Sequence, residues 1–563
     1  MKHIKKMFAV LLIIIQAKAD TETVDGVTYN YHVFYGKDHG EAVISRRSHG
    51  YGYIYRAEYS AAQGGGDHLK IPTTLGGYPV TCIDDYAFYK CGRTSVTIPN
   101  SITNIGMHAF EDCNDLRSVM IFPSNRLKVG DRAFACDNLI AVGTTDLAAW
   151  CNIDFVGVAA NPLSKARNFY APDLVKNLVV PDGVEEIKPY AFLHCNDLIS
   201  VTIPNSVKSI GEYAFSSCSK LTSVAIPNSV TNIGKHAFYR SGLASVTIPN
   251  SVTSIEYGAF EGCESLPNVT IPNSVKTIGD RAFYDCCHLK SVHIADLAAW
   301  CRIESYGNSF PEHINLFMNG ESVKDLIIPD SVENIRSFAF SPFSYLTSVT
   351  IPNSVTNIGY HAFDGGSHLK SVHIADLAAW CRMGAGYCFN LDYYDDGYNL
   401  YLKGELVTDL IIPDSVAIIS DHAFADCRSL TSVTIPNSVT NIGAFAFANC
   451  RSLKWCVIPP SVKSMKSYVF SHSSSLSAVY YLGNAPAFTS DHIYDEAPSN
   501  LVSYVMEGST GWLLPDFPAV PKTWPLNGGH HSRAIKYGAP TQIKDASNGK
   551  GKAPLVHTIK SRE

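Results

Sequence analysis

Cysteine is the residue type most able to do chemistry in this chain, and its spacing is regular. Nine of the 16 cysteines follow an Ala-Phe pair at the third position or one position short of it. In four other copies of this pattern the same slot holds Ser241, Phe343, Gly366 and Ser473. A slot that accepts Phe and Gly favours buried packing. Disulfides between neighbouring copies are the alternative, because adjacent strands lie within reach of a bridge. The nine cysteines are Cys91, Cys113, Cys136, Cys195, Cys218, Cys263, Cys286, Cys427 and Cys450.

Histidine also recurs in register, because four histidines directly precede an Ala-Phe pair: His108, His236, His361 and His422. Other copies hold Tyr, Phe, Arg or Gly at this position, which predicts an amphipathic surface and not a ligand set. Cys286-Cys287 lacks the second ligand pair that a zinc site needs. We therefore expect no metal and no cofactor.

Catalytic motifs are not visible in the sequence. It contains no G-x-S-x-G elbow, no H-E-x-x-H, no phosphate loop and no dinucleotide fingerprint. Asp392, Asp395 and Asp396 could belong to a hidden active site or bind calcium, although their spacing is not that of an EF-hand loop. The sequence predicts a protein that is not an enzyme.

The charge balance argues against nucleic acid as a partner. The chain has 563 residues, 17% of them charged, and a formal net charge of −6. Loss of four lysines with residues 1–19 would leave −10; because residues 522–563 carry +6, the body between them carries −16. With 11% aromatic residues the composition is not that of a disordered chain.

The first 19 residues resemble an export signal. Three lysines precede an apolar run from Met7 to Ile15, and Ala17-Lys18-Ala19 supplies the small residues of a cleavage site. Nine apolar residues are too few to cross a bilayer as a helix. We expect a secreted or cell-surface protein without a transmembrane span; an N-terminal membrane anchor is the alternative.

An internal repeat determines the elements that must position all these residues. Ala-Phe and the apolar phrase before it, as in SVTIPNSVTNIG, recur with a period of 23 residues, which predicts a solenoid. In three places the gap is longer by 34 to 38 residues. The thirteen repeated Phe residues are Phe88, Phe110, Phe134, Phe192, Phe215, Phe238, Phe260, Phe283, Phe340, Phe363, Phe424, Phe447 and Phe470.

Each copy can be interpreted residue by residue, as in Leu221 to Phe238. Val224 and Ile226 face one side of a strand, and Pro227 ends it because it cannot donate to the ladder. A second apolar pair and a glycine corner follow, and Phe238 fills the centre of the coil. Stacking of neighbouring copies is what buries these side chains.

The three long gaps, near residues 139–177, 289–325 and 369–409, share an insert beginning Asp-Leu-Ala-Ala-Trp-Cys. This segment predicts a short helix with Asp as its N-cap. Met318-Asn319-Gly320-Glu321 predicts a hairpin. HLKSVHIADLAAWCR occurs twice at an offset of 80 residues, which indicates a duplicated block.

The pattern L-x-x-V-x-I-P-x-x-V-x-x-I-G-x-x-A-F-x-x-C resembles the BspA-like, or treponemal-type, leucine-rich repeat over residues 69–481. The resemblance implies an α/β repeat solenoid: a right-handed coil with a parallel β-sheet on one face and short helical or irregular segments elsewhere. It also implies an exported or surface protein with an adhesive role. Because repeat folds host many ligands, function transfers less well than fold.

A terminal coil without a neighbour would expose its hydrophobic core and an unpaired strand edge, so the ends of the array are expected to carry capping segments. Residues 20–68 alternate like strands and predict an N-terminal cap, and residues 482–521 predict a C-terminal cap. Residues 522–563 predict a disordered basic tail. A tyrosine stripe in the first cap could instead contact a glycan: Tyr51, Tyr53, Tyr55 and Tyr59.

The open face of the sheet is the remaining candidate for function. Its outward position is predicted to be a hydroxyl-rich, nearly uncharged column, suited to many weak contacts with a protein or polysaccharide. Thr on an exposed strand is also common without any function, and an ice-binding array is disfavoured by the interruptions. The candidate binding residues are Thr202, Thr247, Thr270, His293, Thr350, His373 and Thr434.

Three functions therefore compete. The first is an exported, surface-associated scaffold that binds an extracellular protein or glycan. The second is a structural surface or matrix protein that associates with itself and has no foreign ligand. The third, an enzyme, has no motif in its favour. The sequence leaves the ligand and the oligomeric state open.

Overall fold

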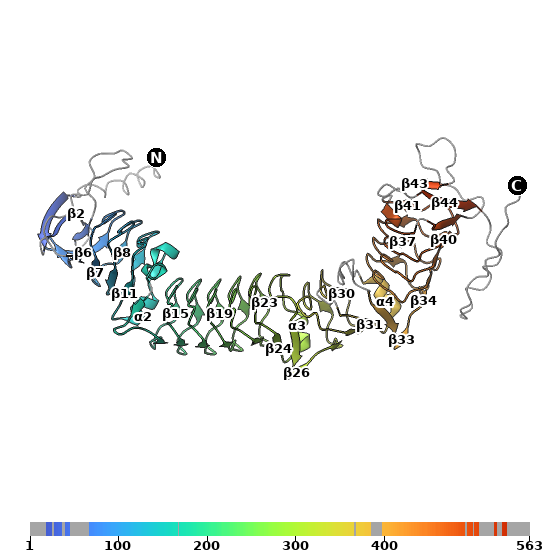
Figure 1. Cartoon of the computed structure of the whole chain (residues 1–563), viewed down its shortest axis with the longest axis horizontal. Helices are drawn as coiled ribbons and strands as arrows, with labels where there is room; N and C mark the ends of the chain where they lie inside the picture. Colours follow the sequence, from blue (N-terminus) through green and yellow to red (C-terminus); the bar gives the residue numbers. More distant parts are fainter. Residues whose placement is uncertain are drawn as a thin grey trace, which may run out of the picture. The chain divides into compact units, whose positions relative to one another are not determined.

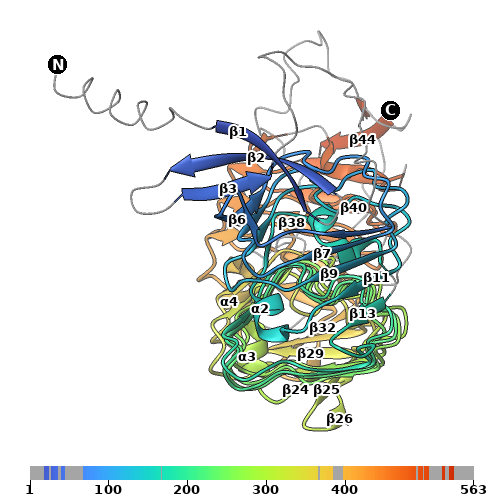
Figure 2. The same cartoon turned by 90° about the vertical axis from the view of Figure 1, so that its left-hand side faces the viewer.

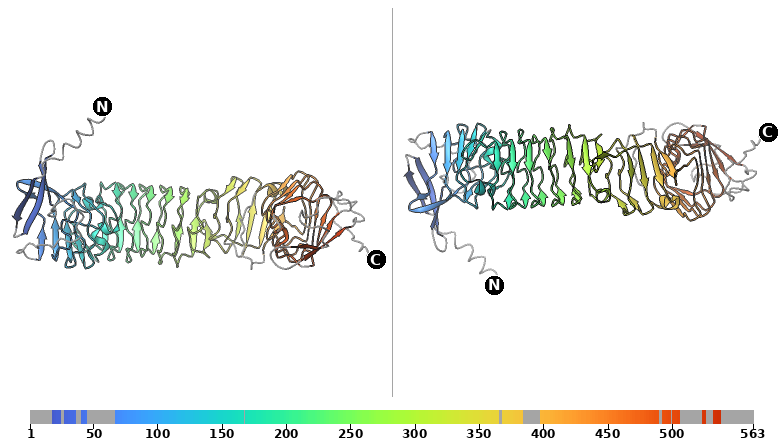
Figure 3. Two further views of the ribbon diagram at one scale, coloured as in Figure 1. Left: turned by 90° about the horizontal axis from the view of Figure 1, so that it is seen from above. Right: turned by 90° about the horizontal axis from the view of Figure 1, so that it is seen from below.

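The computed structural model describes residues 18–24, 27–35, 40–44, 67–166, 168–364, 368–383, 397–489, 492–498, 500–505, 523–525 and 532–537. The chain divides into two compact units, which we describe separately. Unit 1 comprises residues 1–291 with 308–311, and unit 2 comprises residues 292–307 with 312–563. Both consist of stacked coils, with the strands of successive coils side by side (Figures 1 and 3). The predicted repeat solenoid is confirmed.

The repeated S-V-T-I segment, or its equivalent, forms the first strand of each coil. These strands pair in parallel. They are regular because Val and Ile point inward at every second position, as in β18, where Val224 is buried between exposed neighbours. In unit 1 the first strands are β4 (His68–Lys70), β7 (Ser95–Ile98), β9 (Ser118–Ile121), β11 (Ala141–Gly143), β13 (Asn168–Tyr170), β14 (Asn177–Val179), β16 (Ser200–Thr202), β18 (Ser223–Ala225), β20 (Ser245–Val246) and β22 (Asn268–Thr270).

Unit 2 continues the same series. A strand at its start, β24, begins at the unit boundary, and two antiparallel partners, β26 and β33, come from hairpins. The strands are β24 (Ser291–Ile294), β25 (Asn315–Met318), β26 (Glu321–Ser322), β27 (Asp325–Ile327), β29 (Ser348–Ile351), β31 (Ser371–Ile374), β32 (Asn399–Leu402), β33 (Glu405–Leu406), β34 (Asp409–Ile411), β36 (Ser432–Thr434), β38 (Trp455–Ile458), β40 (Ala478–Tyr481) and β42 (Val502–Val505).

A second series of parallel strands was not predicted. In most copies a pair of residues, such as Asn232-Ile233, forms a two-residue strand, too short to show alternation in the sequence. The longer β6 (Tyr78–Ile83) leads β8 (Asn104–Ile105), β10 (Lys128–Val129), β12 (Asp154–Phe155), β15 (Glu186–Ile187), β17 (Ser209–Ile210), β19 (Asn232–Ile233), β21 (Ser254–Ile255) and β23 (Thr277–Ile278) in unit 1. Unit 2 contains β28 (Asn334–Ile335), β30 (Asn357–Ile358), β35 (Ile418–Ile419), β37 (Asn441–Ile442), β39 (Ser464–Met465) and β41 (Ala487–Phe488).

The core of each unit is a stack of the repeated Phe rings. Phe215 and Phe238 are fully buried, and their ring centres lie 5.5 Å apart with nearly parallel planes. Phe424 and Phe447 repeat this geometry in unit 2. The backbone N–H of Phe215 donates to the carbonyl of Ala237 in the next coil at 2.8 Å, and Phe447 donates in the same way to Val469. The ring stack and this hydrogen bond add to the strand pairing that joins each coil to the next.

At the inserts, a buried Trp contributes to the contact between successive coils. Helices α2 (Leu147–Cys151), α3 (Leu297–Cys301) and α4 (Leu377–Arg382) are capped by Asp146, Asp296 and Asp376, as predicted. Each helix buries a Trp whose indole N–H donates to the Ala carbonyl of the next Ala-Phe pair. The indole N–H thus takes the place of a Phe backbone N–H as donor to the Ala carbonyl that follows each insert. Both series of strands are interrupted at these inserts.

The hairpin predicted at Met318–Glu321 is confirmed, since Met318 pairs with Glu321 and Asn319 and Gly320 both adopt positive φ. A second hairpin, from β32 to β33, turns through Lys403 and Gly404 and was not predicted. Because Lys403 is an unusual residue for the left-handed region, its sequence gives a weaker turn signal than Asn-Gly.

The segment predicted as an N-terminal cap contains β1 (Lys18–Val24), β2 (Val27–Tyr35) and β3 (Gly40–Ile44). These strands lie beside β6 and extend the second series (Figure 2), and Tyr29 donates to the carbonyl of Lys70. A small hairpin joins β5 (Thr74–Leu75) to β6. The tyrosine stripe at 51–59 and most of the predicted leader lie outside the described residues.

At the other end the structure differs from two predicted boundaries. The coil geometry continues past residue 481, because Tyr494 stacks on Phe470 and β42 pairs with β40. The predicted disordered tail contains β43 (Thr523–Pro525) and β44 (Ser532–Tyr537), which extend this sheet from β42. The open edge of β42 offers backbone hydrogen-bond partners to any extended segment. The basic composition of the tail gave no sign of this pairing. The remaining tail lies outside the described residues.

Candidate functional site

The outer row is the candidate site: the third residue of each first strand, whose side chain points away from the core. In unit 1 one such row crosses five strands from β14 to β22. Thr202, Thr247 and Thr270 are all exposed in it. The row reads Val179, Thr202, Ala225, Thr247, Thr270. Here the structure brings together three of the predicted binding residues.

The outer row of unit 2 has a different chemistry. It crosses β27, β29, β31, β32 and β33 in continuous register and reads Ile327, Thr350, His373, Tyr401, Leu406. The rings of His373 and Tyr401 stack with centres 4.6 Å apart. The two predicted residues Thr350 and His373 are therefore neighbours, but in an apolar and aromatic setting.

The two remaining predicted residues are His293 and Thr434. His293 on β24 stacks on Phe317 of β25, with ring centres 4.7 Å apart. Thr434 belongs to a further row from β34 to β42, which reads Ile411, Thr434, Val457, Tyr480, Tyr504. The inserts thus divide the expected single column into separate rows.

Sequence reasoning missed the aliphatic residues that begin these rows. Val179, Ile327 and Ile411 are 64%, 68% and 58% exposed. They stand in the segments LVVP and LIIP, where the third strand position holds an aliphatic residue in place of the Thr of the regular copies. Alignment of these segments with the regular copies would have shown an exposed aliphatic side chain after every insert.

A polar row runs beside the outer row, at the first position of each strand. In unit 2 it contains Asp325, Ser348, Ser371 and Asn399. The hydroxyls of Thr347 and Ser348 donate to Asp325 Oδ1 at 3.0 and 2.6 Å. These hydrogen bonds, that from Ser348 being the largest contribution, lower the pKa of Asp325, so its carboxylate is ionised at neutral pH.

The outward face of the second strands is more polar. In unit 1 the matching positions are occupied by Glu186, Ser209, Asn232, Ser254 and Thr277. Exposed apolar groups on a regular surface mark interaction sites more often than exposed polar groups do. The first-strand face is therefore the better candidate.

The cysteine slot is a packing position, as the sequence favoured. Its cysteines carry thiols, and Cys218 Sγ donates to the carbonyl of Phe192 at 3.2 Å, one coil earlier. Ser473 makes the same bond to Phe447 at 3.0 Å. Burial raises the pKa of Cys218 and of Cys263 to about 12, which keeps these thiols protonated and poorly reactive.

The histidine slot forms a ladder of stacked rings. Tyr213 lies on His236 with centres 4.7 Å apart, and His422 lies on Phe445 at 4.8 Å. All four of these residues adopt positive φ, so their backbone N–H groups reach the next coil, as from Tyr213 to the Lys235 carbonyl. The sequence predicted an amphipathic surface at this slot, but it did not predict the positive φ or the hydrogen bond to the next coil.

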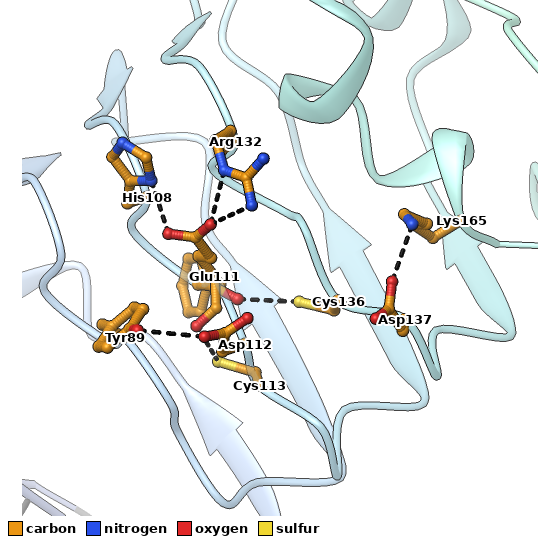
Figure 4. A network of polar contacts seen from close by, with 10 residues as sticks. Tyr89, His108, Glu111, Asp112, Cys113, Arg132, Cys136, Asp137 and Lys165 are labelled. Carbon is orange, nitrogen blue, oxygen red and sulfur yellow. Dashed lines mark hydrogen bonds and ion pairs between the residues drawn. The ribbon is translucent and has the colours of Figure 1, made fainter.

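Titratable groups meet around Glu111 (Figure 4). Its carboxylate accepts from His108 Nδ1 at 2.6 Å and from Arg132 Nε at 2.6 Å, and the three residues come from two coils. Glu261 lies between His236 and Arg281 in a looser version, at 3.7 and 3.8 Å. Both clusters bring together residues of neighbouring coils, which is the pattern of a structural contact between coils.

In the described part of the chain, no helix is long and apolar enough to cross a membrane. The same residues contain no cluster of three or more His, Cys, Asp or Glu positioned to hold a metal ion.

The sequence matches the family described as BspA type leucine rich repeat region, in six copies over residues 69–146, 185–306, 313–392 and 397–501. The last match ends 20 residues beyond the predicted end of the repeats, in agreement with the extra coil. No protein of curated function matches the sequence.

Several solved structures are similar. A leucine-rich repeat protein from Bacteroides ovatus is 23% identical over 86% of this chain and 94% of its own, with a TM-score of 0.35. A leucine rich cell surface protein from Faecalibacterium prausnitzii is 24% identical over 83% and 96%, with a TM-score of 0.27. The pneumococcal vaccine antigen PcpA is 16% identical over 88% and 95%, with a TM-score of 0.28.

Proposed function

Because the chain belongs to the BspA-type leucine-rich-repeat family, we propose that it is an exported, cell-surface-associated scaffold that binds an extracellular protein or glycan and has no catalytic activity. One relative of similar fold is named a cell surface protein. The leader-like sequence of residues 1–19 supports export.

The outer row of unit 1 carries this proposal. Thr202, Thr247 and Thr270 present hydroxyls on a rigid parallel sheet, at strand spacing, without a charged side chain in the row. The backbone of each strand is held by its neighbours, so a ligand does not have to order this surface. Many weak contacts along such a row add up through avidity.

Surface retention is proposed to use the basic tail. Residues 522–563 carry +6, and acidic surface polymers would hold them electrostatically. Release of the protein from cells by high salt supports this mechanism. Retention in high salt contradicts it.

The experiment is a binding assay of residues 20–563 against purified extracellular-matrix proteins and glycans. The test variant carries Thr247→Arg and Thr270→Arg, which place two long cations in the row. The matched control carries Asn232→Arg and Thr253→Arg, two exposed residues on the second-strand side, one in the coil of Thr247 and one in the coil before it.

A saturable interaction that the Thr variant loses and the control keeps is the expected result. Equal binding by both variants would move the site away from the outer row. No binding to any member of the panel would contradict the scaffold function for those ligand classes.

A further inference from the structure

The row from Ile327 to Leu406 reads alike in both directions. An exposed aliphatic residue stands at each end, 68% exposed at Ile327 and 44% at Leu406. Between them lie Thr350, His373 and Tyr401, with His373 at the exact middle of the five paired strands. The row contains no Lys, Arg, Asp or Glu.

This order suits a two-fold interface. In such an interface the same patch of both copies meets, and a residue on the axis faces itself. With the axis parallel to the strands and passing through β31, Ile327 meets Leu406 of the second copy. Thr350 then faces Tyr401, a hydroxyl opposite a phenol, and His373 faces its own copy.

The polar row beside it obeys the same symmetry. Ser371 shares β31 with His373 and would face itself, and Ser348 on β29 would face Asn399 on β32. Hydroxyl and carboxamide groups each donate and accept, so neither pairing leaves like charges opposed. Aliphatic therefore meets aliphatic, and hydrogen-bonding group meets hydrogen-bonding group.

The other rows lack this property. The unit 1 row changes from Val179 to Thr270, and the row of the last sheet changes from Ile411 to the stacked pair Tyr480 and Tyr504. Reversal of either row would place an aliphatic group against Thr or Tyr. The self-complementary row is therefore specific to the β27–β33 sheet.

From this pattern the geometry points to a second copy of this chain as the partner of the β27–β33 face, in a two-fold dimer with His373 on the axis. This inference does not depend on the proposed ligand binding in unit 1. Five strands span only about 19 Å, less than a standard interface. We therefore expect a weak dimer that forms only at high protein concentration.

Sedimentation equilibrium of the full chain, up to about 300 μM, tests the inference. The unchanged protein is expected to form dimers, and Ile327→Asp or Leu406→Asp is expected to leave monomers because each buries a carboxylate against an aliphatic partner. The matched control is Ile411→Asp, an exposed Ile in the same slot of another row. Circular dichroism melting checks that each variant is folded.

A cross-linking experiment locates the axis. Facing sheets lie about 10 Å apart, too far for a disulfide, so a short bismaleimide is used in a background with Cys287→Ser and Cys388→Ser. His373→Cys is expected to give covalent dimers by itself. Ile327→Cys is expected to give them only when mixed with Leu406→Cys, and the background protein none.

A monomer at the highest concentration would overturn the inference, as would equal loss of association in Ile411→Asp. Larger open assemblies, or cross-linking of Ile327→Cys with itself, would exclude a closed two-fold dimer through His373.

Discussion

The outer rows of the two units differ in chemistry, whereas the coils beneath them are alike. Both rows begin with an aliphatic residue, but the unit 1 row continues mainly with Thr, whereas the unit 2 row contains the stacked pair His373 and Tyr401. In both units a column of buried Phe rings lies under these strands. Core and surface therefore vary independently in this fold.

The inserts are the source of the difference. A regular copy places Thr in the outer row, but the strand that follows an insert places Val179, Ile327 or Ile411 there. The insert also supplies a Trp that preserves the core across the interruption. The inserts can thus change the chemistry of the outer row without loss of the stack of buried rings. The following variants test this interpretation.

Removal of an insert's Trp should have the largest effect. Trp380→Ala removes a buried ring and the donor to the Ala423 carbonyl, so we expect a loss of about 3–5 kcal/mol in the free energy of unfolding. Trp380→Phe keeps a ring but leaves that carbonyl without its indole donor, at a cost of about 1–3 kcal/mol. Urea titration measures both. If Trp380→Phe were neutral, the indole would not replace the backbone donor.

The ring ladder of unit 2 should make stability depend on pH. Burial lowers the pKa of His422 from 6.5 to about 4, so the unfolded chain binds its proton first and stability falls as the pH falls from about 6.5 to about 4. Allowing for partial solvent screening, we expect a loss of about 1–2 kcal/mol.

His422→Phe tests this dependence, because Phe occupies the same slot at Phe338 and Phe445 with positive φ. Thermal melting at pH 7 and pH 5 should show a smaller difference for the variant than for the unchanged protein. An equal difference would place the acid sensitivity elsewhere.

The cysteine slot should respond modestly in both units. Cys218→Ser keeps a donor for the Phe192 carbonyl and copies Ser473, so little change is expected. Cys218→Ala loses that donor, and we expect a cost of about 1 kcal/mol. Urea unfolding of the two variants compares them directly. A larger loss with Ser than with Ala would contradict a hydrogen-bonding role for the slot.

Conversion of the unit 2 row to the unit 1 pattern should have the smallest effect on stability. Tyr401→Thr changes a partly exposed side chain, so the free energy of unfolding should change by less than about 1 kcal/mol. Self-association should nevertheless weaken, because Thr350 of the second copy loses its aromatic partner. A large loss of stability would show that the row belongs to the core of the fold.

Much of the fold was predictable because the repeat reports on burial at every coil. The Phe column, the insert helices with their Asp caps and the Asn319-Gly320 hairpin all follow from residue type and spacing. The two-residue second strands and the positive φ of the residues in the histidine slot do not follow from the sequence, since neither leaves a periodic signal. The strands of the tail could not be predicted for a different reason. Their pairing depends on the open edge of β42 and not on the composition of the tail.

The candidate site was predictable only in part. Thr202, Thr247 and Thr270 lie in one row, as expected from copies that are nearly identical in sequence. Tyr401 and Leu406 were missed, since their strands belong to an insert that does not follow the repeat. Their position in the row is set by strand pairing, which the sequence of the insert does not specify.

The most direct test compares two variants in two assays. Thr247→Arg with Thr270→Arg, and separately Ile327→Asp, are each measured for binding to the matrix-protein and glycan panel and for sedimentation. The account predicts that the Thr variant loses ligand and still dimerises, whereas Ile327→Asp binds ligand as a monomer. If either variant lost both properties while remaining folded, or if the Thr variant kept full ligand binding, the division between the two rows would be contradicted.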